Sequence, residues 1–125
     1  MRKILQILVG LPGVLFLFLG IRWLVDPGSA AEALGMPLLE GVGRSTQIGD
    51  LAAFFITLSV MIFAGLITGK RTWFYPPVML LGLAALFRIT AWIVHDAALA
   101  MHLIVPELVV ATLLFFVSAQ ISEKE

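Results

Sequence analysis

The chain has 125 residues, of which 61% are hydrophobic and only 13% are charged, whereas roughly 25% of residues are charged in an average soluble domain. Eight Lys and Arg residues balance eight Asp and Glu residues, which excludes a strongly basic nucleic-acid-binding protein. The chain has no cysteine, so disulfide scaffolds and thiolate metal sites are excluded as well. This composition predicts an integral membrane protein.

Four segments are long and apolar enough to cross a bilayer, because a membrane helix needs about 20 apolar residues. We therefore expect an all-α four-helix membrane bundle, with residues 1–125 forming a single transmembrane domain. The predicted spans run from about Ile4 to Val25, Ile48 to Thr68, Pro76 to His95 and Leu99 to Ile121.

The long connection between the first two spans predicts a short helix at the membrane surface. Asp26 and Pro27 are typical of a helix start, because proline is favoured at the first helical position. Gly35 and the following Met36-Pro37 are typical of a helix end. We expect this interfacial helix from Pro27 to Leu34, and a cap for the second span at Arg44-Ser45-Thr46.

The basic residues predict the orientation, because Lys and Arg are enriched in cytoplasmic loops. Arg2 and Lys3 precede the first span, Lys70 and Arg71 lie between the second and third spans, and Lys124 follows the fourth. An even number of spans also places both termini on one side. We expect cytoplasmic termini, and a first span that is retained because it is longer than the about 7–15 apolar residues of a signal peptide.

Ionisable residues concentrate in the outer half of the predicted bundle. Arg88 lies two helical turns before the end of the third span, about 10 Å below it, and Glu107 lies at a similar distance from the start of the fourth. Since these spans form a tight hairpin, both residues should lie at one depth. Asp50 enters the second span near the same level, so we expect a salt-bridged cluster of Arg88, Glu107 and Asp50.

Helical periodicity indicates which faces point inward. On the second span, Gln47, Asp50, Phe54 and Thr57 recur on one predicted interior stripe, and on the first span Gly10, Gly13 and Gly20 form a small-residue stripe that permits close helix approach. On the third span, Arg88, Trp92 and His95 share a face. We expect an outer-leaflet ligand pocket lined by Asp50, Phe54, Arg88, Trp92, His95 and Glu107.

Three stretches resemble a known family. Residues 34–38 (LGMPL), 43–50 (GRSTQIGD) and 91–96 (AWIVHD) are similar to a family of small four-helix bacterial inner-membrane proteins of unknown function that is distantly DoxX-like. The resemblance covers nearly the whole chain. It implies a location in the bacterial inner membrane and supplies no catalytic residues.

Three functions are compatible with these patterns. The first is a non-enzymatic protein whose polar pocket binds a lipid, a quinone or another small amphiphile, and in which the Arg88 cluster could also be purely structural. The second is an accessory or assembly subunit that docks a membrane-protein partner or a second copy through its glycine or apolar face. The third is a small intramembrane enzyme that uses Asp50, Glu107 and His95 as acid–base groups. We expect no cofactor, no metal site at His95, Asp96 and His102, and no nucleic-acid partner.

Overall fold

The computed structural model describes residues 3–121, which are helical apart from turns and connecting loops. Four of the helices are long and apolar enough to cross a membrane. The expected all-α bundle is therefore confirmed, and its elements are α1 (Lys3–Val25), α2 (Pro27–Ala33), α3 (Gly41–Thr68), η1 (Arg71–Phe74), α4 (Tyr75–Val94) and α5 (Met101–Gln120).

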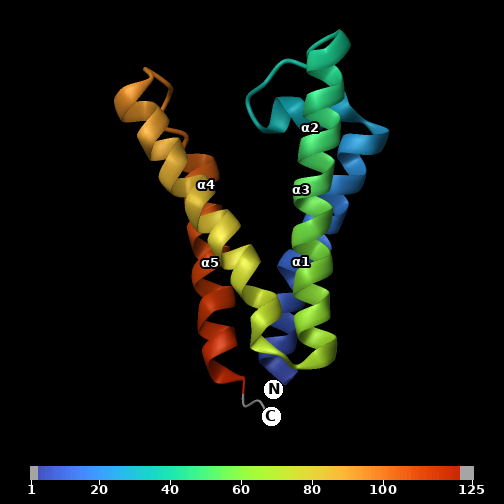
Figure 1. Ribbon diagram of the computed structural model, residues 1–125, viewed down its shortest axis with the longest axis vertical. Coiled ribbons are helices and arrows are strands. Elements are labelled where there is room, and N and C mark those ends of the chain that lie inside the picture. Colours follow the sequence, from blue (N-terminus) through green and yellow to red (C-terminus); the bar gives the residue numbers. More distant parts are fainter. Residues whose placement is uncertain (1–2, 122–125) are drawn as a thin grey trace.

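The long helices form two arms. The first arm is the pair α1 and α3, with α2 packed against α1, and the second arm is the hairpin of α4 and α5. The arms meet at the end where α3 leads through η1 into α4, and they diverge toward the opposite end (Figure 1). The former is called the closed end below, and the latter the open end.

Small residues bring α1 and α3 together. A Cβ atom added at Gly20 would lie 2.5 Å from Cγ1 of Ile56, and one added at Gly13 would lie 3.0 Å from the ring of Phe63. The hydroxyl of Ser59 also donates a hydrogen bond of 2.8 Å to the backbone oxygen of Gly13. Gly13 and Gly20 of the predicted stripe are thus buried within the chain and are not free to dock a partner, whereas Gly10 is only half-buried.

The face of α3 that is buried differs from the predicted stripe. From Asp50 to Ile62 the buried residues are Ala52, Phe55, Leu58, Ser59 and Ile62. Of the predicted stripe, Gln47 is buried, whereas Asp50 and Thr57 are exposed. The prediction was wrong because it assumed that each helix faces a common bundle centre. Instead α3 packs mainly on α1, and the hairpin of α4 and α5 contacts it chiefly near the closed end.

The start of α3 was also predicted too late. The helix begins at Gly41 rather than at Ile48, because the polar residues Arg44 to Gln47 interrupt the apolar pattern without interrupting the helix. The amide of Gln47 faces the preceding loop, where its Oε1 accepts a hydrogen bond of 2.7 Å from the Leu39 N–H and its Nε2 donates one of 3.0 Å to the Pro37 oxygen. These bonds fix the loop to the first turns of α3.

The short helix α2 follows the predicted pattern. Pro27 is its first residue, and its end at Ala33 lies within one residue of the expected boundary. Gly35 adopts a left-handed φ of 77°, and the N–H groups of Gly35 and Met36 donate to the carbonyls of Glu32 and Ala31 at 2.9 Å each. These two hydrogen bonds form a Schellman motif, a helix termination that glycine favours.

The closed end is tightly packed. Phe74 of η1 is fully buried, and its ring lies so close to Gly65 that an added Cβ would lie 2.6 Å from it. The Arg71 side chain donates a hydrogen bond of 2.9 Å from Nη2 to the Ile121 oxygen, which joins the turn to the end of α5. These contacts hold the two arms together at this end and leave the other end open.

Candidate functional site

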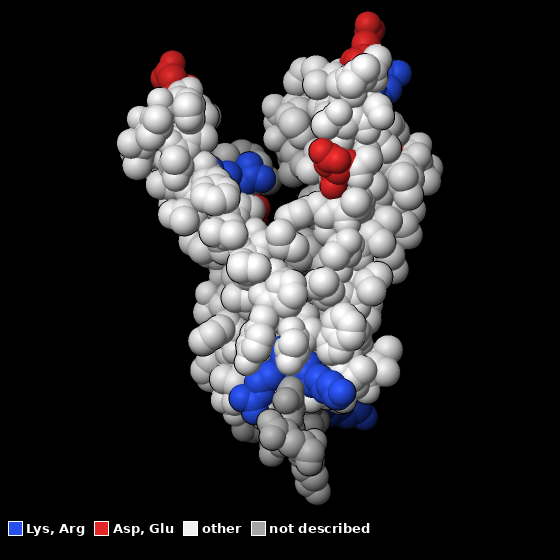
Figure 2. All heavy atoms as spheres, viewed as in Figure 1, with Lys and Arg blue, Asp and Glu red and all other residues white. Residues whose placement is uncertain are grey.

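A cavity of about 350 Å³ lies between the two arms. Figure 2 shows the molecular surface hollowed between the arms toward the open end, with basic and acidic side chains inside the hollow. Every element except η1 contributes to the wall, α2 through the residue that ends it. The lining is Leu15, Phe16, Leu19, Leu34, Leu51, Phe54, Phe55, Leu81, Ala84, Arg88, Leu103, Pro106, Glu107 and Val110.

One salt bridge interrupts this apolar lining. Nε of Arg88 donates a hydrogen bond of 2.9 Å to Oε1 of Glu107, and the two side chains are 33% and 14% exposed. The pair forms because the hairpin of α4 and α5 places both residues at the same distance from its turn. The pairing of Arg88 with Glu107 is therefore present as expected.

The salt bridge leaves part of both groups unused. Among residues 3–121, the Nη1 and Nη2 atoms of Arg88 have no hydrogen-bond acceptor, and Oε2 of Glu107 has no donor. A guanidinium has five N–H donors in a planar fork, so four of them are available. The cavity wall thus presents donors and an acceptor next to each other.

Asp50 does not join this pair. Its side chain is exposed, it does not line the cavity, and it makes no ion pair within the described part of the chain. The predicted three-residue cluster was wrong in this respect. The hairpin does bring Arg88 and Glu107 level with each other, but Asp50 lies on an exposed face of α3 that does not line the cavity.

Of the other predicted pocket residues, Phe54 lines the cavity, but Trp92 and His95 do not. Trp92 is 47% exposed, and His95 is exposed as well. Both lie in the last turn of α4 or just after it, where the second arm has moved away from the first (Figure 1). Their shared helical face with Arg88 is real, but beyond Arg88 that face has no opposing helix.

Sequence reasoning predicted Phe54 but missed Phe16 and Phe55, the other two aromatic residues of the cavity wall. Phe16 of α1 and Phe55 of α3 stack with ring centroids 6.0 Å apart, and Phe55 meets Phe54 edge to face at 5.2 Å. Phe16 and Phe55 are buried, and all three rings line the cavity. Hydrophobicity alone does not show which apolar residues of a membrane helix face a cavity and which face lipid, because both kinds are apolar. Only the orientation of the helix shows this.

The described residues do not assemble an acid–base centre of the predicted kind. Glu107 lines the cavity, whereas Asp50 and His95 are exposed outside it. Within residues 3–121, no group of three His, Asp or Glu side chains lies close enough to hold a metal ion. The chemistry that this cavity offers is therefore apolar contact together with one hydrogen-bonding ion pair.

Comparison of the chain with protein-family models, curated proteins and solved structures found no match. The resemblance to DoxX-like membrane proteins stays a prediction. The geometry of the cavity is therefore the feature of the molecule that indicates a function.

Proposed function

We propose that this chain is a non-enzymatic integral membrane protein that binds a small amphiphile in the cavity between its arms. The observation that supports this proposal most is the lining, which is apolar except for the Arg88–Glu107 pair. Ligand pockets combine mostly hydrophobic walls with a few polar groups that orient the ligand. An amphiphile has the same division into an apolar and a polar part.

The exposure of Arg88 supports a binding role over a purely structural one. A salt bridge that only fixes helix register is best placed in a closed interior, where both groups are fully satisfied. Here the Arg88 side chain is one-third exposed, and its free N–H groups border a cavity of about 350 Å³. Small-molecule sites have volumes of about 300–1,000 Å³, so the cavity is large enough for a ligand.

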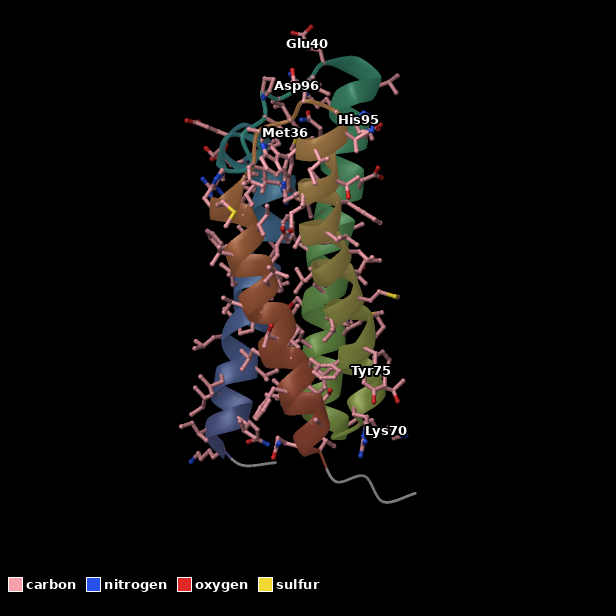
Figure 3. The ribbon with its side chains drawn as sticks, turned by 90° about the vertical axis from the view of Figure 1, so that its left-hand side faces the viewer. Met36, Glu40, Lys70, Tyr75, His95 and Asp96 are labelled. Carbon is pink, nitrogen blue, oxygen red and sulfur yellow. The ribbon has the colours of Figure 1, made fainter. Side chains whose placement is uncertain are left out.

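The charge distribution supports an orientation with the closed end in the cytoplasm. Lys70 lies at the closed end, while Glu40 and Asp96 lie at the open end (Figure 3). The first turn of α1 is also at the closed end (Figure 1). By the positive-inside rule, both termini would be cytoplasmic and the cavity would open toward the outer leaflet. Arg2 and Lys124, which contribute to the same rule, lie outside the described residues.

The proposed membrane is the inner membrane of a bacterium, as the family resemblance implies. In that setting the occupant would come from the bilayer itself or from its outer surface. A lipid, a quinone or a related small amphiphile would enter between the diverging helices with its apolar part against Phe16 and Phe55.

The experiment is identification of bound molecules after extraction of the protein with its surrounding lipid. Ala84 lines the cavity, so Ala84→Phe should fill it, whereas Ala53 is exposed on α3 and Ala53→Phe is the matched control. We expect mass spectrometry to find a species enriched over bulk lipid in the unmodified protein and in Ala53→Phe, and depleted in Ala84→Phe. Equal lipid composition in all three proteins would refute the proposed site.

A further inference from the structure

We infer that the cavity selects a neutral, single-chain amphiphile whose headgroup carries a hydroxyl group. This inference rests on the proposed function and specifies the chemistry of the ligand. A fatty alcohol, a prenol and a monoacylglycerol share this chemistry. It follows from three properties of the cavity, namely its charge balance, its unused hydrogen-bonding atoms and its size.

The charge balance favours a neutral headgroup. Among the described lining residues, the ionised groups are one guanidinium and one carboxylate, joined at 2.9 Å. An anionic headgroup beside Arg88 would also lie beside Glu107, whose charge opposes its binding, and a cationic headgroup would meet the opposite problem. The repulsion from one member of the pair offsets the attraction to the other, so a charged headgroup gains little, whereas a neutral headgroup avoids both repulsions.

The unused atoms favour a hydroxyl over other neutral groups. Nη1 and Nη2 of Arg88 can donate, and Oε2 of Glu107 can accept. A hydroxyl has one donor and two acceptor lone pairs, so it can accept from Arg88 and donate to Glu107 at the same time. An ester or ketone carbonyl can only accept, which leaves Oε2 of Glu107 without a donor after the ligand has excluded water.

The position of the pair indicates how the molecule would lie. Leu81 lines the cavity two turns before Arg88 on α4, toward the closed end; two turns correspond to about 10 Å along the helix. The headgroup would therefore lie toward the open end, and the tail toward Leu81 and the stacked rings of Phe16 and Phe55.

The volume of the cavity favours a ligand with a single hydrocarbon chain. The cavity volume of about 350 Å³ is near the lower limit of the about 300–1,000 Å³ that small-molecule sites occupy. A two-chain phospholipid would leave one chain outside the cavity, and its phosphate would add the negative charge that Glu107 opposes. A single tail with a small head fits both conditions.

Three probes with one common tail test the inference. The full-length protein in phosphatidylcholine nanodiscs is exposed to photoreactive oleyl alcohol, methyl oleate and oleate, each with a diazirine at the same tail carbon, at a pH that keeps oleate ionised. Labelled peptides are then quantified by mass spectrometry. We expect the alcohol to label peptides that contain Leu81 or Phe55 about tenfold more than either other probe, because bonds to charged groups contribute enough for such a ratio.

Variants of the pair make the test specific. Glu107→Gln keeps an acceptor for Arg88 but removes the opposing charge, so oleate labelling should rise by roughly tenfold. The same change replaces the acceptor Oε2 with an N–H donor, so the alcohol should lose its advantage over methyl oleate. Ala84→Phe should abolish labelling by all three probes at the cavity residues, and the exposed control Ala53→Phe should change nothing. The thermal midpoint of each variant is recorded to establish that it is folded.

Each other result has a defined meaning. Equal labelling by the three probes, or a preference for oleate in the unmodified protein, would overturn the inference and leave the proposed function intact provided that Ala84→Phe still blocks labelling. Labelling that Ala84→Phe does not reduce would show attachment at the lipid-facing surface and would overturn the proposed function as well.

Discussion

Replacing Arg88 with alanine should destabilise the protein strongly. Among residues 3–121, removing any other positive charge outside the closed end should cost less. The change deletes the hydrogen-bonded partner of Glu107, whose side chain is 14% exposed. The matched control is Arg22→Ala, because Arg22 lies in the last turn of α1 and forms no ion pair among residues 3–121.

The magnitude follows from the burial of the two groups. Breaking a buried ion pair costs about 3–5 kcal/mol, because it leaves a charge without compensation. Arg88 is one-third exposed to the cavity, so water can reach the remaining carboxylate, and we expect a loss of about 2–3 kcal/mol in the free energy of unfolding, closer to the value for hydrogen bonds to charged groups. Arg22→Ala should cost less than about 0.5 kcal/mol, because the half-buried Arg22 has no ion-pair partner that would be left unpaired.

The double variant Arg88→Met with Glu107→Leu tests whether the unpaired carboxylate causes the loss of stability. Replacing both charges with apolar groups of similar volume is often neutral or stabilising, so the double variant should recover most of the loss. The free energy of unfolding is measured by steric trapping or in mixed micelles, with thermal midpoints as a second measure. If Arg88→Ala were no worse than Arg22→Ala, or if the double variant were as unstable as Arg88→Ala, the unpaired carboxylate would not be the cause.

Three further predictions test the packing and the orientation. Gly20→Ala should lower the free energy of unfolding by about 1–3 kcal/mol through overpacking against α3, whereas Gly82→Ala, where an added Cβ meets nothing within 4 Å, should be neutral or stabilise by up to about 1 kcal/mol, as thermal midpoints will show. Gln47→Ala removes the two hydrogen bonds from the Gln47 side chain to the loop before α3 and should accelerate hydrogen exchange over residues 36–39. Unchanged exchange there would contradict the assigned contacts. Reporter fusions at Lys70 should be cytoplasmic and those at Glu40 external, and the reverse pattern would contradict the proposed orientation.

The parts of the structure that are determined locally could be predicted from the sequence. Pro27 and Gly35 specify the start and end of α2 through backbone conformations that few other residues allow. The pairing of Arg88 with Glu107 could also be predicted, because two residues at equal distances from a tight turn share one depth. Neither inference requires knowledge of how the two arms are inclined.

The parts that depend on that inclination could not be predicted. Asp50, Trp92 and His95 were assigned to the pocket on the assumption of parallel helices around one centre, and the divergence of the arms leaves all three exposed. Phe55 was missed for the same reason, since an apolar helix in an apolar solvent carries little information on which face is buried. Helix crossing also depends on close contacts such as that between Gly65 and the ring of Phe74, which the composition of the helix does not specify.

Arg88 lies on α4 and its partner Glu107 lies on the next helix, α5. This order has a consequence for membrane insertion during synthesis. When α4 leaves the ribosome, α5 has not yet been made, and a lone arginine near the middle of a membrane helix costs about 2.5–3.5 kcal/mol on insertion scales. That cost is offset only when Glu107 arrives with the next helix. The α4 segment should therefore wait at the translocon and enter the bilayer together with α5 as one hairpin, so a chain that stops before Met101 would retain Arg88 in a helix that is poorly inserted.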